Sequence, residues 1–410
     1  VTFHNGKAVD GAAVKASFER AMKMQERAVT AAKIESIEAD GQNVTIRTTE
    51  PFGAFLANIS EPMYSIVDVD AGTDFATAPV ATGPFKVTGF EVNSYIELER
   101  YEGYWNGASD VDTMTVRCVD DDGSRGRALQ SGELDIVQRV AWTDIPTFEA
   151  DSNFQVFDTQ GARTRILSFN YAKPRLADVN VRKALAACIN YEKLVSVLGS
   201  GVSVAGAPYP ASAPYGYQDL NRQAYDAEAA ARDLADSGYT EKNADGYLVK
   251  DGEELMFTVH YSNNSFTTML EAVQSMAKEV GIHLELKMVD STSELGEKGD
   301  FDILCGNTQV LSTGDPQWYL DSFFKTGSPN NVTKYSNADL DAVIERLAQT
   351  FDIAEREKLT IEAEKIMLDD CAAIWLVGEN NFVVASSKVQ NVVPYPIDYY
   401  FVDNGLTISK

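Results

Sequence analysis

The sequence predicts an α/β protein of two lobes, in which mixed sheets are flanked by helices. The chain has 410 residues, which is too many for a single hydrophobic core. Short apolar runs alternate with amphipathic helical patterns through its second half, as in layered α/β folds. A strand pattern followed by two capped helical patterns, at 166–198, indicates a new domain near the middle of the chain.

Residue types within 166–198 justify these elements. The apolar run 166–171 is typical of a strand. Asp178 and Asn190 stand where a side-chain oxygen can accept from the free N–H groups of a helix start. Around Leu185, apolar residues recur with the spacing of one buried helical face. We expect these helices to form the base of the second lobe, and we expect substitution of Leu185 to cost stability.

The remaining elements follow from the same two periodicities. Alternating residues on either side of Asp40-Gly41 predict a hairpin, and the segment 201–216, rich in Pro, Gly and Ser, predicts a surface loop. The expected helices are 10–22, 51–59, 124–132, 224–238, 266–280, 337–347 and 354–371. The expected strands are 33–40, 43–48, 82–90, 94–100, 113–119, 134–137, 255–261, 283–289, 301–305, 374–377 and 382–385.

Composition excludes several classes of partner. The formal net charge of −26 repels nucleic acid and anionic lipid. It is typical of a solvated acidic surface, and a cleft that attracts a cationic ligand is the alternative. No apolar run approaches the roughly 18 residues of a membrane-spanning helix. The four cysteines occur singly, and the apolar runs around three of them favour buried free thiols over a zinc site, although disulfide status stays open.

Motifs of catalysis are missing from the sequence. It contains no G-x-S-x-G elbow, no phosphate-binding P-loop and no H-E-x-x-H helix, and its three histidines lie in structural contexts. We therefore expect no catalytic residues, no bound metal and no cofactor. Two loops offer ligand-binding groups: 306–319, which follows a strand, and 60–64. The alternative for the first loop is that Asp315-Pro316 caps the next helix and that Trp318 and Tyr319 belong to the core.

Landmarks spread along the whole chain resemble one known family. The order and residue types of these landmarks are similar to those of the extracytoplasmic solute-binding proteins of peptide and nickel ABC importers, bacterial solute-binding protein family 5. They are Phe3-His-Asn-Gly6, Thr82-Gly-Pro-Phe85, Tyr104-Trp105, Gly132-Glu-Leu-Asp-Ile136, Phe169-Asn170, Val181-Arg-Lys-Ala-Leu185, Gly238-Tyr239, Asp315-Pro316, Tyr335-Ser-Asn337 and 362–369.

The resemblance implies a two-lobe fold like that of periplasmic binding proteins, of type II and similar to cluster C. Lobe one would be discontinuous, comprising 1–167 and the return segment 386–410, and lobe two would comprise 168–385. The strands 166–171 and 382–385 would form the hinge between the lobes. In this family further chain precedes the Phe3-His-Asn-Gly6 landmark and helps build lobe one, so we expect lobe one to be N-terminally incomplete here.

The resemblance also implies a function. A monomer outside the cytoplasm, in the periplasm or at the cell surface, with a lipid anchor as one form of attachment, would close on a small-molecule or peptide ligand and deliver it to a membrane permease. The ligand is expected to be a short peptide, with a nickel chelate or metallophore as the alternative. A hydrolase on a two-lobe scaffold is a remote alternative, and a surface chaperone or adhesin without a ligand is a third.

Site residues follow from the two loops and from the tail. The family's peptide binders often carry an aspartate shortly before the Asp-Pro pair, but Leu311 to Gly314 contain no acid. Its nickel-chelate binders often carry an arginine where Glu61 stands, and reversing that charge would suit an amino group or another cation. The expected ligand contacts are Glu61, Tyr64 and Tyr399 in lobe one, and Asn307, Gln309, Thr313, Asp315 and Trp318 in lobe two.

Overall fold

The computed structural model describes residues 1–216, 220, 222–397, 399–400 and 403–409. The chain forms two compact units. Unit 1 is discontinuous and comprises Val1–Thr159 and Asn381–Lys410, and unit 2 comprises Gln160–Asn380. The lobe boundaries expected from the sequence, at 167/168 and 385/386, stay a prediction.

Unit 1 begins with helices that pack on a hairpin. The Asp10 side chain accepts from the backbone N–H of Ala13 and so caps α1 (Gly11–Met24). Apolar residues of α1, such as Phe18, meet Ile34 and Ile37 of the hairpin in one buried cluster. The helices here are α1, α2 (Glu26–Ala32), α3 (Phe55–Asn58) and the 3₁₀ turn η1 (Pro62–Tyr64); the hairpin strands are β1 (Ile34–Asp40) and β2 (Asn43–Thr48).

A three-stranded antiparallel sheet and a second core complete unit 1. The sheet has the order β3-β4-β5. The next two elements in the chain, α4 and β6, contact each other. A short strand pair, β16 and β17, lies in the C-terminal tail. These elements are β3 (Phe85–Glu91), β4 (Tyr95–Arg100), β5 (Thr113–Arg117), α4 (Asp122–Gln130), β6 (Ile136–Gln138), η2 (Trp142–Asp144), α5 (Ile145–Glu149), β16 (Val389–Gln390) and β17 (Thr407–Ile408).

Two long strands carry the chain from one unit to the other. The outgoing strand β7 (Phe154–Phe169) contains the step from Thr159 to Gln160, and the returning strand β15 (Ala373–Ser386) contains the step from Asn380 to Asn381. The strand predicted at 166–171 is only the end of β7. The separate strands predicted at 374–377 and 382–385 were wrong, because the polar residues between them continue the same strand β15.

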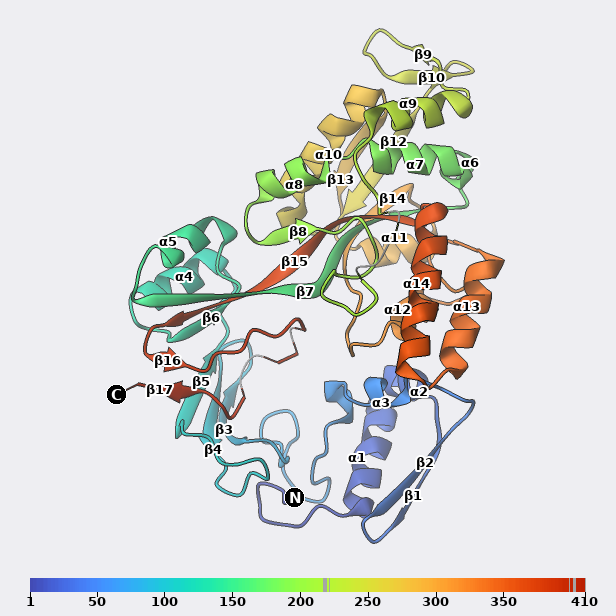
Figure 1. Cartoon of the computed structure of the whole chain (residues 1–410). Coiled ribbons are helices and arrows are strands. Elements are labelled where there is room, and N and C mark those ends of the chain that lie inside the picture. Colours follow the sequence, from blue (N-terminus) through green and yellow to red (C-terminus); the bar gives the residue numbers. More distant parts are fainter. Residues whose placement is uncertain (217–219, 221, 398, 401–402, 410) are drawn as a thin grey trace. The chain divides into compact units, whose positions relative to one another are not determined.

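The main sheet is mixed, as the sequence predicts. Its order is β13-β12-β14-β7-β15-β6, and β8 also pairs with β15 (Figure 1). Strands β12 and β13 are parallel, as are β12 and β14, whereas β14 runs antiparallel to β7. The strands of unit 2 are β8 (Val202–Val204), β9 (Glu241–Lys242), β10 (Leu248–Lys250), β11 (Glu253–Glu254), β12 (Met256–Tyr261), β13 (His283–Met288) and β14 (Ile303–Gln309).

Helices of unit 2 pack in pairs around this sheet. Asp178 and Asn190 cap α7 and α8 as predicted, each accepting from a backbone N–H in the first turn. Helix α7 packs on α9, and α13 packs along α14 (Figure 1). The helices are α6 (Pro174–Ala177), α7 (Val179–Ala187), α8 (Tyr191–Leu198), α9 (Ala227–Asp236), η3 (Asn264–Phe266), α10 (Thr267–Val280), α11 (Thr292–Lys298), α12 (Gln317–Phe323), α13 (Ala338–Gln349) and α14 (Ile353–Asp369).

The segment 201–216 differs from its prediction as a surface loop. It starts with the strand β8, and all of 205–209 is buried, as are Tyr215 and Gly216, whereas residues 211, 212 and 214 are exposed. The segment is therefore covered except around 211–214. None of the described helices is long and apolar enough to cross a lipid bilayer.

Candidate functional site

A row of polar side chains lies on one face of the main sheet in unit 2. In the β7–β14 register, Arg165 stands opposite Asn307 and Arg163 stands opposite Gln309. Side chains two residues apart on a strand point to the same face, and so do directly opposed pairs. The four side chains therefore share one face. Together with Glu379 of β15 they are called the polar row below.

Glu379 joins the polar row by bonding across strands. Its Oε1 accepts from Nε of Arg165 at 2.8 Å, and its Oε2 accepts from Nδ2 of Asn307 at 3.0 Å. Arg165 is 3% exposed and also donates to the backbone oxygen of Ser265 at 3.2 Å. Its guanidinium lies 4.8 Å from the ring centre of Phe266. Charge and hydrogen bonding thus fix Arg165 and Glu379 against each other.

Two buried atoms of the polar row make no hydrogen bond with the described part of the chain. Within the described part of the chain, neither Oδ1 of Asn307 nor Nε2 of Gln309 has a hydrogen-bond partner, although both atoms are buried. Gln309 is 9% exposed, and its Oε1 accepts from Nη2 of Arg163 at a long 3.5 Å. A buried polar atom without a partner costs about 1–3 kcal/mol. The row thus holds one acceptor and one donor that a ligand could satisfy.

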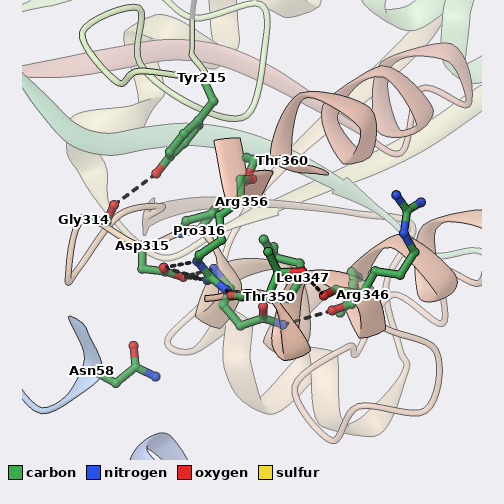
Figure 2. A network of polar contacts seen from close by, with 12 residues as sticks. Asn58, Tyr215, Gly314, Asp315, Pro316, Arg346, Leu347, Thr350, Arg356 and Thr360 are labelled. Carbon is green, nitrogen blue, oxygen red and sulfur yellow. Dashed lines mark hydrogen bonds and ion pairs between the residues drawn. The ribbon is translucent and has the colours of Figure 1, made fainter. Parts of the chain in front are cut away.

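Asp315 lies in a tightly held loop before α12 (Figure 2). Its two carboxylate oxygens accept from Nη2 of Arg356 at 2.7 Å each, and Oδ2 also accepts from Nε at 3.1 Å. The Tyr215 hydroxyl donates to the backbone oxygen of Gly314 at 3.2 Å (Figure 2), and the Tyr209 hydroxyl donates to that of Pro316 at 3.3 Å. The negative charge of Asp315 is therefore neutralised inside unit 2, and the loop is held on both sides.

The structure places the other lobe-two candidates in different settings. Asn307 and Gln309 belong to strand β14 rather than to the predicted loop 306–319. Thr313 is half-buried in that loop, and Trp318 is half-buried on α12, where its ring meets Phe323 edge-on at 5.6 Å between centres. Only Asn307 and Gln309 are thus brought into the polar row, and the ligand contacts expected of all these residues stay a prediction.

The lobe-one candidates lie in unit 1. Glu61 is 5% exposed, and its Oε1 accepts from Nη2 of Arg27 at 2.5 Å. Tyr64 is buried, and its hydroxyl donates to the backbone oxygen of Ala28 at 2.6 Å. Burial raises the pKa of Tyr64 to about 12, and the nearby Glu61 carboxylate adds to that rise. Tyr399 is exposed in the tail. Glu61 is already paired with a cation, which weakens the argument for a cationic ligand at this point.

Sequence reasoning missed three members of the polar row. Arg163 and Arg165 lie in the run Ala162-Arg-Thr-Arg-Ile-Leu167, and Glu379 lies between apolar stretches of β15. A charge inside an apolar strand is costly unless it is paired, so each was a signal of a partner or a site. No group of three or more His, Cys, Asp or Glu side chains that could hold a metal ion occurs among the described residues.

The protein has two units joined by two long strands, and buried polar atoms without hydrogen-bond partners lie on one face of the main sheet. This arrangement is typical of two-domain solute-binding proteins. Residues 1–331 match the family model of bacterial extracellular solute-binding proteins, family 5 Middle. The chain belongs to this family. Its members are extracytoplasmic, bind small-molecule or peptide ligands and work with the permease of an ABC importer.

Individual relatives cover nearly the whole chain. The nickel-binding protein NikA of Staphylococcus aureus is 26% identical over 412 residues, which are 100% of this chain and 82% of the relative. The glutathione-binding protein GsiB of Pectobacterium atrosepticum is 26% identical, over 99% of this chain and 81% of the relative. A nickel ABC transporter structure from Bacillus halodurans superposes with a TM-score of 0.85 at 33% identity, over 99% of this chain and 86% of that one. The fold is therefore that of type II periplasmic binding proteins, as expected, and these relatives are binding proteins rather than enzymes.

Proposed function

We propose that this protein captures a short peptide outside the cytoplasm and delivers it, chemically unchanged, to the permease of an ABC importer. The observation that carries the proposal is the unused donor and acceptor of the polar row. Oδ1 of Asn307 and Nε2 of Gln309 belong to side chains two residues apart on one strand. At the rise per residue of a strand, the two residues are about 7 Å apart along it. An extended peptide presents an N–H and a C=O on each residue, with the same spacing between alternate residues.

The charges of the polar row suit the same ligand. Arg163 supplies a guanidinium group, which binds carboxylates such as a peptide's C-terminus with fixed geometry. Arg165 and Glu379 are bonded to each other and hold Asn307 in place for the ligand. Glutathione, the ligand named for GsiB, is itself a short peptide. In this proposal the protein acts as a monomer that is held at the cell surface or in the periplasm, with a lipid anchor as one means of attachment.

A nickel chelate is the second candidate ligand. Two of the relatives are nickel proteins by name, and the guanidinium of Arg163 could hold a carboxylate of a chelating molecule. The candidates separate experimentally. Native mass spectrometry of the purified protein, followed by calorimetric titration with di- and tripeptides and with nickel–histidine, is expected to reveal a bound peptide and saturable peptide binding. A co-purified nickel complex, with no heat from peptides, would overturn the proposal. Product formation from the peptides would favour the hydrolase alternative.

Gln309 provides the residue-level test. Gln309→Met removes the unpartnered donor and keeps most of the side-chain volume, so peptide affinity is expected to fall about tenfold, the equivalent of one hydrogen bond. Thr308→Val is the matched control, because its side chain lies on the opposite face of the same strand. The control should bind like the wild type. Equal peptide affinity in Gln309→Met and in the control would show that the polar row does not contact the peptide.

A further inference from the structure

Glu364 is a buried carboxyl group that none of the predicted ligand contacts includes. It lies on α14 and is fully buried, and neither carboxylate oxygen has a hydrogen-bond partner among the residues that the structure describes. Arg356 and Thr360 precede it at intervals of four residues, so the three lie along one side of the helix. A charged carboxylate without partners is strongly disfavoured in such a place.

The segment 205–216 covers this part of the molecule. Arg222 donates to the backbone oxygens of Ala205, at 2.7 Å, and Gly216, at 3.0 Å, and so ties the two ends of the segment together. Within the segment, the rings of Tyr209 and Tyr215 meet edge-on with centres 5.1 Å apart. Burial raises the pKa of Glu364 to about 8, whereas the Arg222 guanidinium and the Tyr209 backbone lower the pKa by less.

The same two tyrosines hold the loop that contains Asp315. Their hydroxyl groups donate to the backbone oxygens of Pro316 and Gly314, on either side of Asp315. The side chains of Tyr209 and Tyr215 thus lie between Glu364 and the predicted ligand loop 306–319. The groups that act on Glu364 are Arg222, which follows the covering segment, and Tyr209 within it. The charges of Glu364 and Asp315 both act on Tyr209 and Tyr215, and Asp315 is paired with Arg356.

Among these groups, Glu364 is the one that changes charge near neutral pH. Asp315 and Arg356 neutralise each other in an ion pair at 2.7 Å. Burial raises the pKa of Tyr209 and of Tyr215 further above the ordinary value for tyrosine, so both stay neutral in mildly alkaline solution. Loss of the proton from Glu364 to solvent would leave a buried carboxylate that needs water or a cation. Either need is met by opening the segment 205–216 or by drawing Arg222 away from its two backbone oxygens.

We infer that Glu364 is a positioning residue whose proton keeps the segment 205–216 closed over the loop Gly314–Pro316. As the pH rises from about 4.5 to about 8 the segment loosens progressively, Tyr209 and Tyr215 release the loop, and the ligand loses an ordered surface. The effect on the ligand rests on the proposed function, because it assumes that this loop lines the binding site. The loosening itself does not depend on any ligand.

Hydrogen exchange of the 205–216 amides tests the loosening directly. Protection factors, corrected for the intrinsic exchange rate at each pH, are expected to fall about tenfold between pH 6 and pH 7 in the wild type, because there the closed form holds one proton that the open form has lost, and to level off above about pH 8. In Glu364→Gln the protection should stay within about twofold over the same range, because no proton can be lost. Glu362→Gln, on the exposed side of the same helix, is the control and should follow the wild type.

The ligand readout is measured separately. The dissociation constant of a bound peptide should rise with pH in the wild type and in Glu362→Gln, and should stay flat in Glu364→Gln. Constant protection in the wild type up to pH 9, or the same decline in Glu364→Gln, would overturn the inference. If Glu364→Gln does not fold, the wild-type profile still decides, because the inference requires a decline that runs through neutral pH and ends near pH 8. Failure of peptide binding alone would count against the proposed function and not against this inference.

Discussion

Replacing Asp315 should weaken the fold of unit 2 before it affects any ligand. Asp315 makes three hydrogen bonds with Arg356 (Figure 2), and Arg356 is only 7% exposed. In Asp315→Asn the shape is kept and the negative charge is lost, so a buried guanidinium remains without its counter-ion. Breaking a buried ion pair on one side costs about 3–5 kcal/mol.

The remaining bonds of Arg356 set the expected magnitude. Its Nη1 donates to the backbone oxygens of Leu347 at 2.6 Å and Thr350 at 2.9 Å, and these bonds survive the substitution. We therefore expect a loss of about 3 kcal/mol in the free energy of unfolding, at the low end of that range. Asp315→Ala should cost about 1 kcal/mol more, because Oδ1 of Asp315 also accepts from the backbone N–H of Gln317 at the start of α12.

The measurement is urea unfolding at pH 7, followed by the fluorescence of Trp318 and Trp375, which lie in unit 2. Replacing the tryptophans of unit 1, Trp105 and Trp142, by phenylalanine removes the signal of the other unit. Arg356→Met and the double variant complete a thermodynamic cycle, in which the double variant should lose about 2 kcal/mol less than the sum of the single variants. A change below about 0.5 kcal/mol in Asp315→Asn would refute the reasoning and leave Asp315 available as a ligand contact.

Two further predictions concern the core and the thiols. Leu185→Ala should cost about 2–5 kcal/mol in the free energy of unfolding without altering ligand affinity, because Leu185 is 2% exposed on α7. Val197→Ala, at an exposed position on α8, is its control, and an equal loss in both would contradict the assignment of the core. Cys118 is exposed, so a thiol reagent should modify one cysteine in the folded protein and four in urea. The other three thiols, Cys188, Cys305 and Cys371, are buried, and burial raises the pKa of each to about 12. More than one fast-reacting thiol under native conditions would disprove this prediction.

Local signals predicted the capped starts of several helices, whereas the short helices α2, α5, α6 and α11 were not predicted, and α12 only as an alternative. Asp10, Asp178 and Asn190 each accept from an N–H within three residues, so the cap depends only on neighbouring chain. The mixed sheet also followed from alternating patterns and from the resemblance to the family. Strand ends were harder, because sheet pairing extends β7 and β15 through polar and charged residues that an isolated pattern would exclude.

The polar row could not be predicted in the same way. Arg165 and Glu379 are separated by 214 positions in the chain, and their bond exists only because β7 and β15 are neighbours in the sheet. Asn307 and Gln309 were predicted to contact ligand as loop residues, whereas the structure places them within a strand. Asp315 was predicted as a ligand contact because it lies in the loop 306–319, and the sequence could not reveal that Arg356, 41 positions later, neutralises its charge.

The position of the polar row along the chain bears on how binding could be coupled to closure. Arg163 follows the step from unit 1 to unit 2 on β7 by a few residues, and Glu379 precedes the return step on β15. A ligand bonded to the polar row would therefore fix the side chains of the two strand segments that must bend if the units move. Movements of this kind are absorbed by a few residues at element ends or in connecting segments. A ligand that interacts differently with the bent and unbent strands would shift the equilibrium between open and closed forms, and one that interacts equally with both would not.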